Sequence, residues 1–244
     1  MLSVRVLSLP VLLKESDLSG RTAVVFDVLR ATTTIAAAVA AGAEAIRVYG
    51  TLDLAKTAAQ AFAGPNLLAG ETNALRPTDF DLGNSPRDFS ADRCRGKTIL
   101  MATTNGTRAL VAARTADVLL TGSLANAAAT AAAVRRANLP VTLIGSGTQG
   151  EVSLEDLLGC GAVIDALGDG VSLDNDTAVI AKLLWQQSQE QLSAVFHQTF
   201  SSRNLRAAEL LPDVDYCCVM NRSAIACRVW SEGGELVIRG WSND

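Results

Sequence analysis

The stretch Thr22-Ala-Val-Val-Phe-Asp27-Val-Leu-Arg30-Ala-Thr32-Thr33-Thr34-Ile35 decides the fold. An apolar run ends on an acid, an arginine and three threonines follow, and an alanine-rich run of helical period begins. This order predicts a strand, a short loop and a helix N-terminus. In open α/β sheets, ligands bind at the carboxyl ends of strands, and helix N-termini favour anions. The loop therefore predicts a site where Asp27 holds a cation and Arg30 a phosphate or carboxylate, unless Asp27 only caps the helix.

Apolar runs and alanine-rich helical runs alternate from the N-terminus to about residue 168. Such alternation indicates βαβ units and a largely parallel sheet with helices on both faces. We therefore expect an α/β fold with three layers, α/β/α, around a largely parallel or mixed central sheet. The expected strands lie at residues 4–7, 23–27, 45–49, 66–69, 98–102, 117–121 and 141–144, and the expected helices at residues 33–41, 52–63, 106–114, 125–137 and 154–167.

Two later segments depart from this alternation. Residues 174–211 have helical composition, with a turn expected near residues 201–204. Residues 214–239 predict two short strands joined by a turn at Gly233-Gly234.

The chain is expected to form one domain over residues 1–244. Most motifs fall in an α/β core of residues 1–170, and residues 171–244 supply the helical segment and the C-terminal strands. Within the core, residues 76–91 are rich in turn formers. A loop this long in a compact domain is often functional.

The composition argues against several classes of protein. The net charge is −4 and no basic block is present, which argues against a nucleic-acid binder but leaves room for a small anionic ligand. No apolar run reaches the ~18 residues of a membrane span. Residues 1–10 lack the basic start and cleavage site of a signal peptide. We therefore expect a cytoplasmic protein that does not contact a membrane, and the alanine-rich helices hint at a homo-oligomer.

A second polar run, Thr103-Thr104-Asn105-Gly106-Thr107-Arg108, follows an apolar strand and opens a helix. Gly106 permits close approach of the backbone. The hydroxyls of Thr104 and Thr107, the amide of Asn105 and free N–H groups could surround an anion. An ordinary helix cap is the alternative.

Two further runs add candidates with weaker signals. Glu71 ends an apolar run and would stand at the same edge as Asp27 if their strands are parallel neighbours. Asn84 and Ser85 lie in the run Asp81-Leu-Gly-Asn84-Ser85-Pro86, whose composition is typical of a structural turn.

The run Gly145-Ser-Gly147-Thr-Gln-Gly150 matches the G-x-G-x-x-G pattern of dinucleotide-binding loops. Glu151 follows the third glycine, where it would repel a pyrophosphate, so this interpretation is disfavoured. Glu155 and Asp156 then fall in the first turn of a helix. They either stabilise that helix or supply a carboxylate that acts as metal ligand or base.

If the site handles phosphate, missing residues exclude several phosphatase mechanisms. Leu29 stands where the haloacid-dehalogenase type needs a second acid. No cysteine has the Cys-x5-Arg spacing, no P-loop is present, and His197 is the only histidine. What remains is Mg²⁺ held by carboxylates, with the metal and an arginine stabilising charge on the transferring phosphoryl group.

Together these runs resemble the 2-phosphosulfolactate phosphatase (ComB-like) family. The matching pieces are Asp27-Val-Leu-Arg30-Ala-Thr-Thr-Thr, Gly70-Glu71, Phe80-Asp-Leu-Gly-Asn84-Ser85-Pro86, Thr103-Thr-Asn-Gly-Thr107 and Gly147…Ser153-Leu-Glu155-Asp156. Arg203-Asn204-Leu and Asp213-Val-Asp215 continue the likeness weakly. The chain departs from it at Glu209-Leu-Leu211, because family members usually carry a glycine before these aspartates.

The resemblance implies a three-layer α/β fold and Mg²⁺-dependent release of phosphate from 2-phospho-3-sulfolactate. The product would be 3-sulfolactate, on the way to coenzyme M. The expected metal ligands are Asp27, Glu71 and Glu155, with Asp156 as the alternative to Glu155. The expected catalytic residues are Asp27, Arg30, Glu71, Glu155 and Asp156, and the expected substrate-binding residues are Thr32, Thr33, Asn84, Ser85, Thr104, Asn105, Gly106 and Thr107.

Three other functions stay open at this point. The enzyme could hydrolyse another small 2-phospho acid. It could be a phosphotransferase or other nucleotide-using enzyme, although no adenine-binding loop is recognisable. It could also bind small anions without catalysis.

Overall fold

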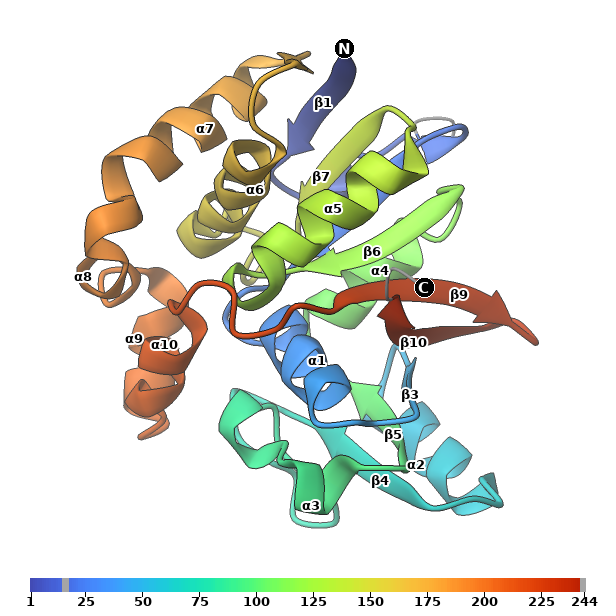
Figure 1. Ribbon diagram of the computed structural model, residues 1–244. Helices are drawn as coiled ribbons and strands as arrows, with labels where there is room; N and C mark the ends of the chain where they lie inside the picture. Colours follow the sequence, from blue (N-terminus) through green and yellow to red (C-terminus); the bar gives the residue numbers. More distant parts are fainter. Residues whose placement is uncertain (15–17, 242–244) are drawn as a thin grey trace.

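The computed structural model describes residues 1–14 and 18–241. Ten strands form one sheet, with helices on both faces (Figure 1). The strands are β1 (Leu2–Leu7), β2 (Thr22–Phe26), β3 (Ala45–Val48), β4 (Asn66–Gly70), β5 (Thr98–Ala102), β6 (Val118–Gly122), β7 (Val141–Gly145), β8 (Val171–Leu173), β9 (Ala226–Glu232) and β10 (Glu235–Trp241). The predicted α/β class and its largely parallel, mixed sheet are confirmed.

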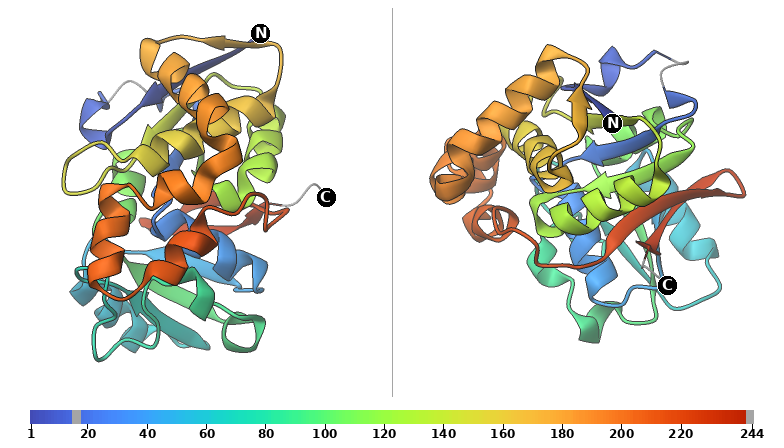
Figure 2. Two further views of the ribbon diagram at one scale, coloured as in Figure 1. Left: turned by 90° about the vertical axis from the view of Figure 1, so that its left-hand side faces the viewer. Right: turned by 45° about the horizontal axis from the view of Figure 1, so that its top comes forward.

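The helices cover both faces of this sheet and fill its crossovers. They are α1 (Ala31–Ala40), α2 (Leu52–Ala61), α3 (Ala91–Cys94), α4 (Gly106–Ala112), α5 (Ala127–Ala137), α6 (Leu154–Leu167), α7 (Asp176–Ser188), α8 (Leu192–Phe196), α9 (Phe200–Ala207) and α10 (Leu211–Cys217). Helices α7 to α10 run along one side of the molecule (Figure 2). Within the described residues, no helix is both long and apolar enough to cross a membrane.

Strand β2 shows how the sequence builds the three layers. All of its residues are buried, and successive side chains of a strand point to opposite faces of the sheet. Val24 and Phe26 pack in a core with α5, α6 and α7, whereas Ala23 and Val25 pack with α1 and α4. A parallel strand covered on both faces therefore needs a continuous apolar run, as this sequence provides.

The C-terminal hairpin joins two groups of parallel strands. The order along the sheet is β4-β5-β3-β10-β9-β6-β2-β7-β1-β8. Strand β10 is antiparallel to β3 and to β9, and β9 is antiparallel to β6. Three antiparallel steps reverse the direction of the sheet, so β4, β5 and β3 run opposite to the group that contains β2.

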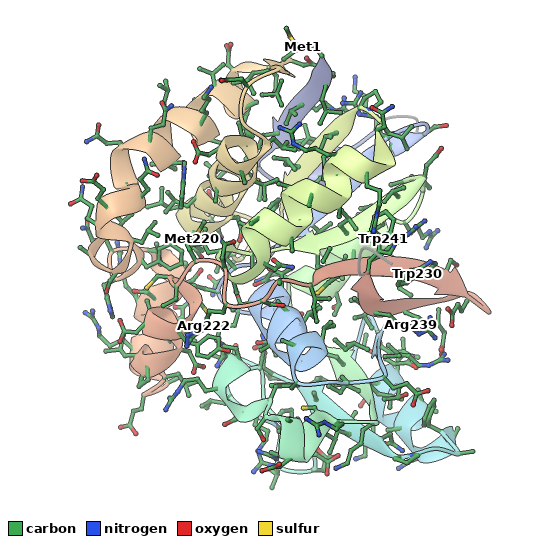
Figure 3. All side chains as sticks on the ribbon, viewed as in Figure 1. Met1, Met220, Arg222, Trp230, Arg239 and Trp241 are labelled. Atoms are coloured by element: carbon green, nitrogen blue, oxygen red, sulfur yellow. The ribbon has the colours of Figure 1, made fainter. Side chains whose placement is uncertain are left out.

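Aromatic side chains hold the hairpin against the rest of the fold. Trp230 and Trp241 lie on its two strands (Figure 3). The guanidinium of Arg136, on α5, lies 3.6 Å from the centre of the Trp241 ring. Such a cation–π contact adds to the packing that keeps the hairpin in the middle of the sheet.

The structure confirms the predicted strands and helices of the first 168 residues but corrects the C-terminal part. Strand β8 was not predicted. The turn expected near residues 201–204 is wrong, because the hydroxyl of Thr199 caps α9 by accepting the Ser202 N–H at 3.1 Å. Residues 214–217 belong to α10, which Pro212 helps to start, so the last strands begin only at Ala226. The Gly233-Gly234 turn is confirmed.

Candidate active site

One acid ties together the carboxyl ends of β2 and β7. Asp156, in the first turn of α6, accepts the Val28 N–H on Oδ1 at 2.9 Å. Its Oδ2 accepts the N–H groups of Ser146 and Gly147 at 3.1 Å each, and the Ser146 hydroxyl at 3.2 Å. These four hydrogen bonds leave Asp156 little capacity to bind a metal, and they give it the task of fixing two loops.

Asp27 is the first residue after β2 and is poorly satisfied by its surroundings. Its Oδ1 accepts the Ala31 N–H at 3.3 Å. Gly106 comes so close that a Cβ there would lie 2.8 Å from the Asp27 Oδ2, which explains the glycine. Burial raises the pKa of Asp27 to about 6. The Ala31 N–H opposes this rise, and the Glu71 and Glu155 carboxylates add to it. A cation beside Asp27 would offset the free-energy cost of ionising this buried carboxylate.

Glu155 is a second acid without adequate partners. Its side chain is 2% exposed, and within the described part of the chain its Oε2 has no hydrogen-bond partner. Burial raises the pKa of Glu155, and the hydroxyl of Ser201 opposes the rise. A buried acceptor without a donor is costly, so a proton or a cation would stabilise this position.

Glu71, by contrast, has both carboxylate oxygens engaged. Its Oε1 accepts the N–H of Thr104 at 2.9 Å and the Thr104 hydroxyl at 2.6 Å. Its Oε2 accepts the Ala74 N–H at 2.9 Å. Glu71 therefore joins the loop that follows β4 to the loop that follows β5.

The predicted reason for the closeness of Glu71 and Asp27 is wrong. Their strands, β4 and β2, are not neighbours, since β5, β3, β10, β9 and β6 lie between them. Both side chains nevertheless line the same cavity, and the charge of Glu71 raises the pKa of Asp27. The segment that follows β5 connects the two acids, since the Thr104 N–H donates to Glu71 and Gly106 packs against Asp27.

Arg30 is buried and held from two sides. Its Nη1 donates to Asp213 Oδ2 at 2.6 Å, and its Nη2 donates to the Ala74 carbonyl at 2.6 Å. Asp213 is fully buried on α10, and its Oδ1 accepts the Ser85 hydroxyl at 2.7 Å. The predicted anion-binding arginine is therefore fixed by a residue from the C-terminal part of the chain.

A cavity of about 350 Å³ opens where these strand ends meet, which suits a small ligand. Six predicted site residues line it, namely Asp27, Arg30, Glu71, Asn84, Thr104 and Asn105. The remaining wall consists of Leu29, Asn73, Ala74, Leu75, Thr148, Gln149, Ser201, Asn204, Leu205, Ala207 and Ala208.

Other predicted site residues, Glu155 and Asp156 among them, do not line the cavity, and several of these shape the loops. The Thr32 hydroxyl accepts the Asp27 N–H at 3.1 Å, and the Thr33 hydroxyl donates to the Val28 carbonyl at 2.8 Å. The Thr107 hydroxyl donates to the Thr103 carbonyl at 2.8 Å. The Ser85 hydroxyl donates a hydrogen bond to Asp213, and the backbone of Gly106 lies close to the Asp27 carboxylate. Their roles in substrate binding stay predictions.

Two tight turns form part of the wall, and the second lies within the G-x-G-x-x-G run. Asn73 and Ala74 have φ values of 52° and 69°, and Gln149 and Gly150 have 55° and 83°. Two successive residues with positive φ are typical of type I′ turns. Residues other than glycine seldom adopt this conformation, and they concentrate at functional sites. The glycine in the second turn was the only signal in the sequence.

The second turn also explains why the G-x-G-x-x-G run is not a dinucleotide site. Thr148 and Glu151 exchange backbone hydrogen bonds of 2.9 and 3.0 Å across the turn. Helix α6 begins only at Leu154. The N–H groups of Ser146 and Gly147, which would face a pyrophosphate, already donate to Asp156.

Helix α9 supplies the last part of the wall. Ser201 and Asn204 line the cavity, although the sequence predicted only a turn near residues 201–204 and a weak family likeness at Asn204. Only the fold brings this helix to the carboxyl ends of the strands.

The donor set fits Mg²⁺ with one or two protein ligands. Within residues 1–14 and 18–241, no three His, Cys, Asp or Glu side chains are arranged as a metal site. Mg²⁺ keeps several waters, however, and one or two carboxylates suffice to bind it. The Glu155 Oε2 has no hydrogen-bond partner in the described part of the chain, and the Asp27 Oδ1 accepts the Ala31 N–H at the long distance of 3.3 Å, whereas the oxygens of Glu71 and Asp156 are already hydrogen-bonded.

Comparison with known proteins agrees with this geometry. A model of the 2-phosphosulpholactate phosphatase family matches residues 7–231. A probable 2-phosphosulfolactate phosphatase from Synechococcus sp. (strain JA-3-3Ab) is 42% identical over 83% of this chain and 86% of its own. One from Carboxydothermus hydrogenoformans is 35% identical over 97% of both chains. The chain therefore belongs to the 2-phosphosulfolactate phosphatase family, whose members are phosphoric monoester hydrolases.

Proposed function

We propose that this enzyme uses Mg²⁺ to hydrolyse 2-phospho-3-sulfolactate to 3-sulfolactate and phosphate. The relatives' names supply the substrate. The charge of the cavity is the observation that supports a requirement for Mg²⁺. Among its described lining residues, Arg30 is the only cation, and its charge meets that of Asp213. Asp27 and Glu71 line the same space, with Glu155 close enough to raise the pKa of Asp27.

This balance of charge makes a cation necessary for the proposed substrate. The substrate carries a phosphate, a carboxylate and a sulfonate, and the ionised acids of the cavity would repel all three. A divalent ion beside Asp27 would make the local electrostatic potential positive and would lower the pKa of Asp27 by stabilising its ionised form. When bound, Mg²⁺ would stabilise the charge that develops on the phosphoryl oxygens.

The chain's own residues would divide the remaining work. Asp27 would hold the metal, and Glu155 either completes the metal site or takes the proton of the attacking water. Arg30 would donate hydrogen bonds to the phosphoryl oxygens. Asn84, Thr104 and Asn105 line the wall and would orient the substrate. The water oxygen attacks phosphorus, the bond from phosphorus to the C2 oxygen breaks, and that oxygen takes a proton to give 3-sulfolactate.

The test is phosphate release from 2-phospho-3-sulfolactate, 2-phospholactate and phosphoglycolate, with Mg²⁺ or with EDTA. We expect turnover that requires Mg²⁺ and a kcat/KM that is highest for the sulfonate-bearing substrate. Equal kcat/KM for all three would assign the enzyme to small 2-phospho acids in general. No phosphate release from any of them with Mg²⁺ present would refute the proposal.

The rival functions give different results in the same assay. A nucleotide-using phosphotransferase would consume ATP, and an anion-binding protein would bind the substrate without releasing phosphate. The engaged N–H groups of Ser146 and Gly147 argue against the first of these. A role in coenzyme M biosynthesis, a cytoplasmic location, a homo-oligomeric state and the absence of nucleic-acid and membrane partners stay predictions.

A further inference from the structure

We propose that Asp213 is a positioning residue that sets the orientation of Arg30 for binding the phosphoryl group. The inference rests on the proposed function, since it takes Arg30 as the phosphate-binding side chain. The sequence assigned no role to Asp213 beyond a weak family likeness. The structure places it under the cavity, on α10, far along the chain from the other site residues.

The contacts around Asp213 form a closed clamp. The Arg30 and Asp213 side chains are 3% and 0% exposed, and their ion-pair distance is 2.6 Å. The second Asp213 oxygen accepts a hydrogen bond from the Ser85 hydroxyl at 2.7 Å, so each carboxylate oxygen has a hydrogen-bond donor that fixes its position. The half-exposed Arg87 adds a cation 4.0 Å from that oxygen. Asp213 therefore has one well-defined orientation.

This clamp determines which part of the Arg30 guanidinium can meet a ligand. A guanidinium is planar and has five N–H donors in a fixed fork. One donor is directed to Asp213 and one to the Ala74 carbonyl, on two different nitrogens. Two such contacts fix the plane of the group, and three N–H groups remain. A side chain held in this way loses little conformational freedom when the ligand binds.

The clamp also connects α10 to the loops on the other side of the cavity. Arg30 donates to the carbonyl of Ala74, the N–H of Ala74 donates to Glu71, and Glu71 accepts two hydrogen bonds from Thr104. A shift of Asp213 would therefore move both Arg30 and the turn that carries Ala74.

Helix α10 offers a matched control two residues away. Asp215 has an exposed side chain and pairs with His197 at 2.9 Å, outside the cavity wall. The variants to compare are Asp213→Asn and Asp215→Asn, each alone, together with Arg30→Lys and the double variant Arg30→Lys/Asp213→Asn. Asparagine keeps the shape of Asp213 and one acceptor oxygen but leaves the buried Arg30 charge without its partner, so the stability of this variant has to be measured. Urea unfolding checks this for each protein.

The readouts are kcat and KM for phosphate release with Mg²⁺, and binding of inorganic phosphate by calorimetry. We expect Asp213→Asn to lower kcat about tenfold or more and to weaken phosphate binding, while Asp215→Asn changes each by less than twofold. If Asp213 acts through Arg30, the double variant is no worse than the more impaired single variant. Independent structural damage would instead multiply the two losses.

Wild-type values of kcat and phosphate affinity in Asp213→Asn, or multiplied losses in the double variant, would overturn the proposal. If Asp213→Asn does not fold, Ser85→Ala removes one contact of the clamp and leaves the ion pair. It should lower kcat two- to fivefold, and an unchanged kcat would overturn the proposal equally. Phosphate binding needs no turnover, so failure of the proposed substrate can be distinguished from failure of the positioning role.

Discussion

The two parallel groups of strands bring acids of opposite character to one cavity and its immediate surroundings. The group that contains β2 and β7 supplies Asp27, which lines the cavity, and, through α6, Glu155, which lies outside the lining. Both are buried and have raised pKa values; among the described residues the Glu155 Oε2 has no hydrogen-bond partner, and the Asp27 Oδ1 accepts the Ala31 N–H at 3.3 Å. The group that contains β4 and β5 supplies Glu71, whose two oxygens accept three hydrogen bonds from the chain. The difference suggests that one side of the cavity carries out the chemistry and the other holds the loops in place.

The largest effect on activity is expected from Asp27→Asn, which removes a charge from the side of the cavity formed by the strand group that contains β2 and β7. The variant keeps the shape of the side chain but removes the carboxylate that we propose as the main ligand of Mg²⁺. We expect kcat to fall roughly 1000-fold, about 4 kcal/mol, together with a higher Mg²⁺ midpoint. Phosphate release at increasing Mg²⁺ measures both. An unchanged rate and midpoint would mean that Asp27 only caps α1.

A loss almost as large is expected from Arg30→Lys on the same side. Lysine keeps the charge but not the planar fork that meets Asp213, Ala74 and the phosphoryl group at once. We expect kcat/KM to fall by the equivalent of about 2–4 kcal/mol while the protein stays folded. Near-normal kcat/KM in a folded variant would make the arginine a structural residue.

In the metal-free protein, replacing Asp27 and replacing Glu71 should change the unfolding free energy in opposite directions. The pKa of Asp27 is about 6 in the folded protein, above its ordinary value of 3.8, so the folded state binds this proton more tightly. The contribution of Asp27 to the unfolding free energy of the wild type therefore falls as the pH rises from about 4 to 6. The Asp27→Asn variant has no such proton to lose, so at pH 8 it should be more stable than the wild type by on the order of 2–3 kcal/mol.

Glu71→Gln should change stability in the opposite direction. It replaces a carboxylate acceptor with an amide that opposes the Ala74 N–H, and we expect a loss of about 1–2 kcal/mol. Urea unfolding in EDTA at pH 5 and pH 8 measures both variants. If both variants destabilise the protein equally at pH 8, the two acids do not differ as described.

The smallest effect concerns the departure from the family pattern at Glu209. This residue has a φ of 60° at the end of α9, where the Leu210 N–H reaches the Leu205 carbonyl at 2.8 Å. Such a C-terminal position with positive φ favours glycine. Glu209→Gly should raise the unfolding free energy by up to about 1 kcal/mol. Glu209→Ala keeps the strained conformation and should be close to neutral, and equal stability of both variants would contradict this explanation.

Much of the fold could be predicted from local sequence signals. The run from Thr22 to Ile35 has an apolar strand buried on both faces, an acid at its end and a helix of small residues, and each signal is local. The position of the C-terminal hairpin could not be predicted, because it depends on pairings of β9 and β10 with strands far away along the chain. The helix α10 was missed because Val214 is typical of strands, although Pro212 favours a helix start.

The candidate site was predictable to the extent that its residues follow strands. Asp27, Glu71 and Thr104 follow strand ends and reach the cavity. Asn204, which lines the cavity, and Asp213, which contacts Arg30, lie in helices without a local signature, and only tertiary packing brings them to the site. The different states of Glu71 and Glu155 also have no counterpart in the sequence, because hydrogen-bond saturation depends on the loops that surround each acid.

Calorimetric titration of the metal-free enzyme with Mg²⁺ at pH 7.5 tests the division between the two sides most directly. The proteins to compare are the wild type, Asp27→Asn, Glu155→Gln and Glu71→Gln. We expect Mg²⁺ to bind the wild type, Asp27→Asn and Glu155→Gln to weaken binding at least tenfold, and Glu71→Gln to change it by less than about twofold. Absence of Mg²⁺ binding in the wild type, or a loss in Glu71→Gln as large as that in Asp27→Asn, would contradict the assignment of the metal to Asp27 and Glu155.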